Sequence, residues 1–192
     1  MPHQIITISG TPGSGKSTIA QKLAEKLNAE RIYVGAIRRE LAREKGITLE
    51  ELNEYGLTHP ETDVDIDQKI AIQAREAAKK GIVIVEGRVQ FHFIPESFKI
   101  FIKVAVEAGA RRIWKQVQNE EAKKLRNEGQ AKSLIQLETE IKNRVANDKK
   151  RYKKYYNLDH TDEAHYDLVI DTTKITAEAA TAKIIQALPK LD

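Results

Sequence analysis

The chain has 192 residues, which is long enough for one domain with a substantial hydrophobic core. Charged residues make up 31% and hydrophobic residues 41% of it, as in ordinary globular proteins, and no apolar run approaches the ~18 residues of a membrane-spanning helix. The absence of cysteine excludes disulfides and thiolate metal sites, and the net charge of +4 mildly favours anionic ligands, whether nucleotides or nucleic acids.

Apolar runs alternate with amphipathic segments along the chain. Strands are expected at residues 5–9, 31–34, 82–85, 100–104 and 168–170. A first helix is expected after the glycine-rich stretch that follows the first strand, ending near residues 27–28, and further helices are expected at residues 36–45, 64–80 and 176–188. A short helix is expected after Thr48, because the spacing of Thr48 and Glu51 fits a capping box. Residues 107–156 read as mostly helical, with an interruption near Gly129. This alternation predicts an α/β fold with a five-stranded parallel sheet, in a single domain spanning residues 1–192.

The stretch between the first strand and the first helix reads GTPGSGKST, which fits the P-loop pattern G-x-x-x-x-G-K-[S/T]. Its glycines let the backbone approach a phosphate, and its N–H groups bind the anion together with the positive end of the following helix. Lys16 would reach the β- and γ-phosphates of ATP, and Ser17 would hold Mg²⁺. The expected ATP site comprises Gly10, Thr11, Pro12, Gly13, Ser14, Gly15, Lys16, Ser17 and Thr18.

Ligands of parallel α/β sheets bind at the carboxyl ends of the strands. Residues 35–39 and 86–88 follow the second and third predicted strands, so we expect them to meet the P-loop in one cleft. Glu86 stands where P-loop proteins place the acid that holds the hydration shell of Mg²⁺. Ser17 and Glu86 are therefore the expected magnesium site, with Glu86 acting through water.

Arg39 and Arg88 each lie shortly after a predicted strand end. An arginine carries a planar, permanently charged fork that matches phosphate oxygens bidentately. Two such forks near Glu86 favour a second, acceptor phosphate over two unrelated surface ion pairs.

Arg144, Asp148 and Arg151 are spaced so that they share one face of a helix. From the residues alone, this pattern fits either a salt-bridge ladder on a solvated helix or a functional cluster. The neighbouring run KKRYKKYY at residues 149–156 interleaves cations with aromatic rings, a feature of nucleic-acid-binding surfaces, and we regard that as the less favoured interpretation.

Taken together, these residues resemble the archaeal-type cytidylate kinases, within the nucleoside monophosphate kinase group of P-loop proteins. The resemblance covers most of the chain, from about residue 5 to residue 185. It is carried by GTPGSGKST, GAIRRELA at residues 35–42, the acidic stretch around Asp63 and Asp67, VEGR at residues 85–88, residues 144–152 and 155–159, and YDLVIDT at residues 166–172.

The resemblance implies a three-layer α/β/α P-loop kinase fold with a helical lid. Residues 36–80 would form the acceptor-binding helical region and residues 114–145 the lid. Asp148 would contact the acceptor's ribose or orient the nearby arginines. Four arginines would contact the acceptor phosphate or the transferring γ-phosphate: Arg39, Arg88, Arg144 and Arg151. The expected catalytic residues are Lys16, Arg88, Arg144 and Arg151, and Arg39 is expected to bind the acceptor only.

We therefore expect a cytoplasmic, Mg²⁺-dependent kinase that uses ATP to phosphorylate CMP or dCMP, acting as a monomer on small nucleotides with no membrane or nucleic-acid partner. Two departures from the family pattern are Ala36, where an aspartate is usual, and Gly109, where an arginine is expected. They leave open a kinase for another acceptor, such as AMP, UMP or a small metabolite, and a nucleotide-binding relative without catalysis. An ATPase stimulated by nucleic acid is the third alternative.

Overall fold

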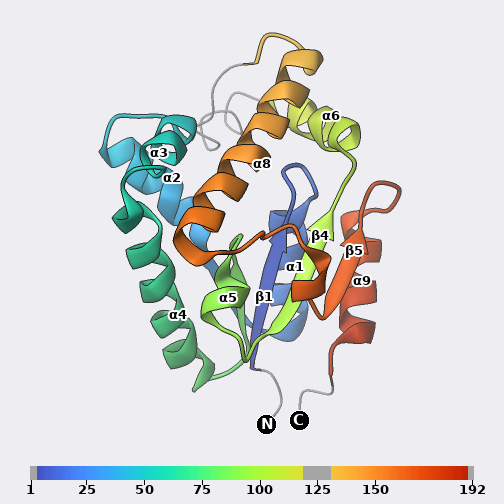
Figure 1. The fold of residues 1–192 in the computed structure, drawn as a ribbon. Helices are drawn as coiled ribbons and strands as arrows, with labels where there is room; N and C mark the ends of the chain where they lie inside the picture. Colours follow the sequence, from blue (N-terminus) through green and yellow to red (C-terminus); the bar gives the residue numbers. More distant parts are fainter. Residues whose placement is uncertain (1–3, 119–130, 190–192) are drawn as a thin grey trace.

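The computed structural model describes residues 4–118 and 131–189. Its centre is a parallel sheet with the strand order β2-β3-β1-β4-β5, so all five strands end at the same edge (Figure 1). The strands are β1 (Ile5–Gly10), β2 (Glu30–Tyr33), β3 (Val83–Glu86), β4 (Phe98–Lys103) and β5 (Leu168–Asp171). The predicted five-stranded parallel sheet is confirmed.

Helices follow most of the strands. They are α1 (Lys16–Leu27), α2 (Val34–Glu44), α3 (Leu49–Tyr55), α4 (Val64–Ala78), α5 (Gln90–Phe93), α6 (Val106–Val117), α8 (Leu134–Tyr156) and α9 (Ala177–Ala187), with 3₁₀ turns at Pro60–Thr62 and Glu163–His165. The capping box predicted at Thr48 is confirmed, because its side chain accepts from the Glu51 N–H while the Glu51 carboxylate accepts from the Thr48 N–H. Within the described parts of the chain, no helix combines the length and apolar character that crossing a bilayer requires.

Alternate side chains of the strands face opposite layers of helices. On β1, Ile6 and Ile8 are fully buried against α1 and α9, whereas Ile5 faces the layer that contains α4. Full burial of one such isoleucine stabilises the fold by roughly 2–3 kcal/mol relative to leaving it exposed. The result is the expected three-layer α/β/α arrangement, with α4 and α9 on opposite sides of the sheet (Figure 1).

Helices α6 and α8 pack against each other beyond the carboxyl edge of the sheet, at the top of the view in Figure 1. Their contact is apolar and includes Ala110 and Ile113 of α6 and Leu137 and Ile141 of α8. The segment expected to form a lid, residues 114–145, covers parts of both helices. The interruption expected near Gly129 lies outside the described residues.

One local prediction is wrong, and one short helix was not predicted. The second helix was expected to begin at Ala36 after a short loop, but α2 begins at Val34, directly after Tyr33 at the end of β2. Gly35 therefore lies in the first turn of a helix. In addition, residues 90–93 form the short helix α5, to which no element was assigned, and Phe91 is buried there against a small aromatic cluster.

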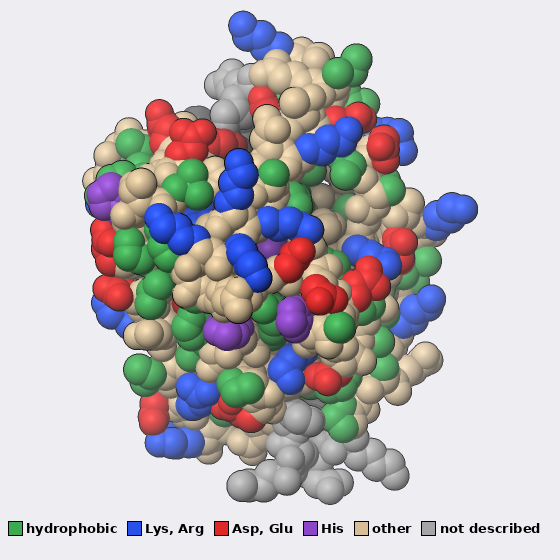
Figure 2. Space-filling model, viewed as in Figure 1, with side chains coloured by type: hydrophobic (Ala, Val, Ile, Leu, Met, Phe, Trp, Pro, Cys, Tyr) green, Lys and Arg blue, Asp and Glu red, His purple; other side chains and the backbone are tan. Residues whose placement is uncertain are grey.

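The face of the molecule that carries α8 shows several Lys and Arg side chains over that helix, with acidic side chains beside them (Figure 2). Two cations of the basic run on α8 have acceptors within the fold. Lys149 pairs with Asp159 at 3.0 Å, and Lys154 donates to the carbonyl oxygen of Leu57. A third, Arg151, is buried with 1% of its side chain exposed. The run is thus not a continuous exposed cationic strip.

Candidate active site

The P-loop forms the turn from β1 to α1 and borders a cavity of about 1010 Å³. Gly13 and Gly15 adopt φ values of 75° and 82°, which side chains with a Cβ rarely adopt, and α1 begins immediately after Gly15. Ser14 is buried, and its hydroxyl makes no hydrogen bond within the part of the chain that the structure describes. A positive helix end beside an unused buried hydroxyl suits an anion such as a phosphate. All nine residues predicted from the motif line this cavity.

Gly109 of α6 lies directly against the P-loop. A Cβ at this position would come within 2.8 Å of the Pro12 carbonyl oxygen, and a Cβ at Gly13 would come within 2.6 Å of the Gly109 Cα atom. Both separations are shorter than van der Waals contact. The departure at Gly109 therefore has a structural explanation in this chain, because two facing glycines let α6 abut the phosphate loop.

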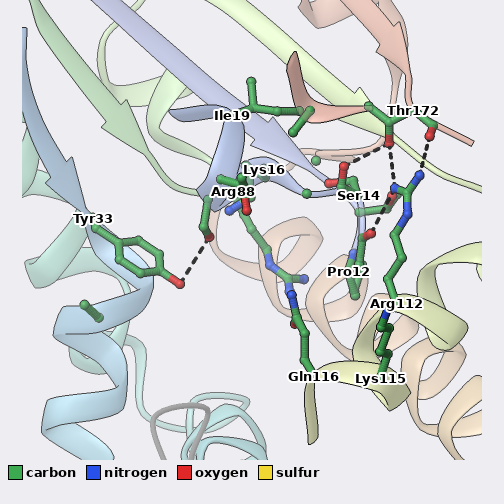
Figure 3. Close-up of a pocket in the computed structure, with 18 of the residues that line it drawn as sticks. Pro12, Ser14, Lys16, Ile19, Tyr33, Arg88, Arg112, Lys115, Gln116 and Thr172 are labelled. Carbon is green, nitrogen blue, oxygen red and sulfur yellow. Dashed lines mark hydrogen bonds between the residues drawn. The ribbon is translucent and has the colours of Figure 1, made fainter. Parts of the chain in front are cut away.

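One helical turn after Gly109, Arg112 enters the same cavity. Its guanidinium donates to the carbonyl oxygen and hydroxyl of Thr172, at 2.5 and 3.2 Å, and to the carbonyl oxygen of Gly13 at 3.4 Å (Figure 3). Arg112 therefore ties α6 to the P-loop and to the segment after β5. Arg112 was not predicted, because no motif in the sequence shows which face of α6 meets the P-loop.

Glu86 is the last residue of β3 and is fully buried beside the P-loop. One carboxylate oxygen accepts from Lys16 Nζ at 2.8 Å and from Ser17 Oγ at 2.6 Å, and the other accepts from Arg31 Nη2 at 2.5 Å. Burial opposes the charge, but the attraction of Lys16 and the three hydrogen bonds outweigh it, so the pKa of Glu86 is lowered. Glu86 is therefore held as a carboxylate. Arg31, one strand away on β2, was not predicted.

A second, smaller cavity of about 90 Å³ adjoins the first. Among the residues predicted for the acceptor side, Asp148 and Arg151 line this smaller cavity alone. Arg39, Arg88 and Arg144 line both cavities, as Lys16 does. The structure therefore brings all the predicted acceptor-side residues to one place, and Figure 3 shows Arg88 in the space between Tyr33 and Arg112.

The acceptor-side charges form a continuous chain of ion pairs across four segments. Asp63 accepts from Arg38 Nη1 at 2.8 Å and lies 3.0 Å from Arg151 Nε. Asp148 in turn accepts from Arg151 Nη2 at 2.9 Å and pairs through its other oxygen with Arg88. Asp63, Asp148 and Arg151 are almost completely buried. Asp148 and Arg151 therefore do not belong to a solvent-exposed salt-bridge ladder, which was one of the two interpretations of the sequence pattern.

Asp67 is buried beside this chain and also lines the smaller cavity. Its two carboxyl oxygens accept from Gln90 Nε2 at 2.6 Å and from the Tyr156 hydroxyl at 2.8 Å. Burial raises the pKa of Asp67 to about 7, because its two hydrogen bonds compensate only partly and the charge of Asp63 adds to the effect. Asp67 is thus a titrating group in the lining of the smaller cavity.

The chain matches known proteins over nearly its whole length. Residues 6–134 match the family described as an AAA domain. The cytidylate kinase of Pyrococcus horikoshii is 33% identical over 189 residues, which is 98% of this chain and 90% of that protein. The cytidylate kinase of Methanocaldococcus jannaschii is 36% identical over 192 residues, covering 97% of this chain and 98% of that protein. Among solved structures, the shikimate kinase of Acinetobacter baumannii matches with a TM-score of 0.55 and 18% identity, over 100% of this chain and 96% of that one.

Proposed function

This chain belongs to the cytidylate kinase family, and from that membership we propose that it transfers the γ-phosphate of ATP to CMP or dCMP. The observation that carries the proposal is the junction between the two cavities, where four cations among the described residues line both: Lys16, Arg39, Arg88 and Arg144. Phosphoryl transfer brings two polyanionic groups together in line, and fixed cations between them offset the repulsion. A single nucleotide site would not need cations that face both cavities.

On the donor side, the P-loop residues 10–18 would hold the phosphates of ATP. Lys16 now donates to Glu86 and lies at the start of α1, where its ammonium group can turn to the β- and γ-phosphates. Arg112, Lys115 and Gln116 line the cavity from α6, on the lid side. Closure of α6 and α8 over bound nucleotides would exclude water and so limit ATP hydrolysis.

Magnesium fits the donor site. The Ser17 hydroxyl and the Glu86 carboxylate lie 2.6 Å apart at the P-loop, and both are the hard oxygen donors that Mg²⁺ prefers. Mg²⁺ usually takes one or two protein ligands beside phosphate oxygens, so these two groups suffice. When bound, the ion would neutralise phosphate charge, with Ser17 as a ligand and Glu86 acting through water.

On the acceptor side, Arg39, Arg88, Arg144 and Arg151 would bind the acceptor phosphate and the transferring group. Each oxygen of Asp148 is paired with an arginine, one with Arg151 and the other with Arg88. This supports the role in which Asp148 orients the arginines rather than the role of a ribose ligand alone. Catalysis in this arrangement is positioning and charge neutralisation by Lys16 and the arginines.

The decisive experiment is an acceptor panel. Purified protein is given Mg²⁺-ATP with CMP, dCMP, UMP, AMP, GMP or shikimate in turn, and release of ADP is measured. We expect CMP or dCMP to give the highest kcat/KM, and a Lys16→Met variant to be inactive with the same acceptor. Preference for another acceptor would replace the substrate assignment, while ATP binding without turnover on any acceptor would favour a non-catalytic relative.

The same assay, repeated with RNA or DNA in place of the acceptors, addresses the alternative of a nucleic-acid-stimulated ATPase. The partners of Lys149 and Lys154 and the burial of Arg151 leave that alternative with little support from the fold. We expect no stimulation of ATP hydrolysis, and a several-fold rise would contradict the kinase assignment.

A further inference from the structure

Among the described residues, five line both the donor and the acceptor cavity, and four of them are Lys16 and three arginines. The fifth is Tyr33, the last residue of β2. Lysine and arginine side chains only donate hydrogen bonds, whereas the hydroxyl oxygen of Tyr33 can accept one from them.

The Tyr33 hydroxyl oxygen joins the two halves of the site. It accepts from Arg39 Nη1 at 2.7 Å on the acceptor side and lies 3.4 Å from Ser17 Oγ on the donor side. The first contact is short and charge-assisted, so it is the stronger of the two. In Figure 3 the hydroxyl of Tyr33 points from the edge of the cavity toward the P-loop.

The ring of Tyr33 is held by the same cations. The guanidinium carbons of Arg31 and Arg39 lie 4.8 and 5.5 Å from its centroid, within the range of cation–π contacts. Burial opposes the phenolate form, but the charge of Arg39 and the hydrogen bond with Ser17 outweigh it, and the pKa of Tyr33 is lowered. These contacts hold the ring and its hydroxyl oxygen beside Arg39.

The first turn of α2 is shaped around this contact. A Cβ at Gly35 would come within 2.7 Å of Tyr33 Cε2 and 3.3 Å of Arg39 Nη1, so a larger residue would push both side chains away. Arg39 Nη1 also donates to the Gly35 carbonyl oxygen at 3.0 Å. Next to it, Ala36 lines the donor cavity with a methyl group.

We propose that Tyr33 is a positioning residue whose hydroxyl holds the Arg39 guanidinium in place for the acceptor phosphate. The Tyr33 hydroxyl and the Gly35 carbonyl oxygen both hold Nη1 of the Arg39 guanidinium. The Arg39 side chain therefore loses less conformational freedom when the phosphate binds. This inference rests on the proposed function, because it takes Arg39 to be a ligand of the acceptor phosphate.

The test is Tyr33→Phe, which keeps the ring and its packing and removes only the hydroxyl. With CMP varied at saturating Mg²⁺-ATP, we expect the KM for CMP to rise about ten-fold while kcat changes by less than about two-fold. Tyr155→Phe is the matched control, since it also removes one hydroxyl hydrogen bond, of 2.6 Å to the Gly56 carbonyl oxygen, but lies outside both cavities. We expect that variant to keep the wild-type KM.

A double-mutant cycle separates positioning of Arg39 from a general effect of Tyr33. In an Arg39→Ala background, Tyr33→Phe should raise the KM by less than about two-fold, because the group that it positions is gone. An unchanged KM in the single variant, or the same ten-fold rise in both backgrounds, would overturn the inference while leaving the kinase assignment intact. A wild-type chain that phosphorylates no acceptor would instead refute the proposed function, and the inference with it.

Discussion

Asp148 is the residue whose replacement tests the acceptor-side network most directly. It lies at the centre of α8, is 1% exposed, and bridges Arg151 and Arg88. Asp148→Asn keeps the size of the side chain and one oxygen acceptor but removes the negative charge. We expect the variant to fold with reduced stability and to bind the acceptor more weakly.

The expected cost follows from the charges. The chain from Arg38 to Arg88 contains three arginines and two aspartates, a net charge of +1, which Asp148→Asn raises to +2. Removing one partner of a buried pair typically costs about 3–5 kcal/mol, and the retained amide oxygen brings our expectation to the low end, about 3 kcal/mol. For a domain of this size, that loss corresponds to a fall in Tm of roughly 6–12 °C.

The measurement is thermal and urea unfolding of both proteins at pH 7. Lys149→Gln is the matched control, because it breaks the neighbouring pair with Asp159, whose side chains are 44% and 47% exposed. An exposed pair contributes about 0–1 kcal/mol, so the control should unfold close to the wild type. A loss below about 1 kcal/mol for Asp148→Asn would mean that water or side-chain rearrangement compensates the buried arginines, and the reasoning would be refuted.

Three further outcomes are expected. Lys16→Met should lower kcat by at least about a hundred-fold while the protein stays folded, with a lower Tm because the buried Glu86 then keeps only Arg31 as a cation, as measured by ADP release and thermal unfolding. Because burial raises the pKa of Asp67 to about 7, the wild type should lose stability as the pH rises from about 4 to 7, and Asp67→Asn should flatten that part of a urea-unfolding profile. Gly109→Ala should weaken ATP binding by calorimetry at least ten-fold, since its Cβ would lie 2.8 Å from the Pro12 carbonyl oxygen, whereas Gly81→Ala, with nothing within 4 Å, should not.

The fold could be predicted because each of its elements has a local signal. The run of four apolar residues before Glu86 predicts a strand buried on both faces, and β3 is buried throughout. The start of α2 could not be predicted in the same way. Gly35 reads as a turn residue, but it lies in the first turn of the helix, where the ring of Tyr33 occupies the space that a Cβ would fill. Such a tertiary contact leaves no trace in local propensity.

The candidate site divides in the same manner. The P-loop is a contiguous motif, so all nine of its residues could be named from the sequence, and the arginines after the strands could be placed from topology. Arg112 and Tyr33 could not be named. The role of Arg112 depends on which face of α6 meets the P-loop. The role of Tyr33 depends on how its ring packs against the guanidinium groups of Arg31 and Arg39. Both are matters of packing rather than of motif.

Arg31 shows why such residues matter for the proposed reaction. Glu86 currently accepts from Lys16 and Ser17 through one oxygen and from Arg31 through the other. If Lys16 left Glu86 to engage a phosphate, a fully buried carboxylate would be stranded unless another cation stayed beside it. Because Arg31 approaches from β2, away from the P-loop, its pairing can persist while Lys16 turns to the nucleotide. Arg31 would thereby lower the free-energy cost of moving Lys16 away from Glu86.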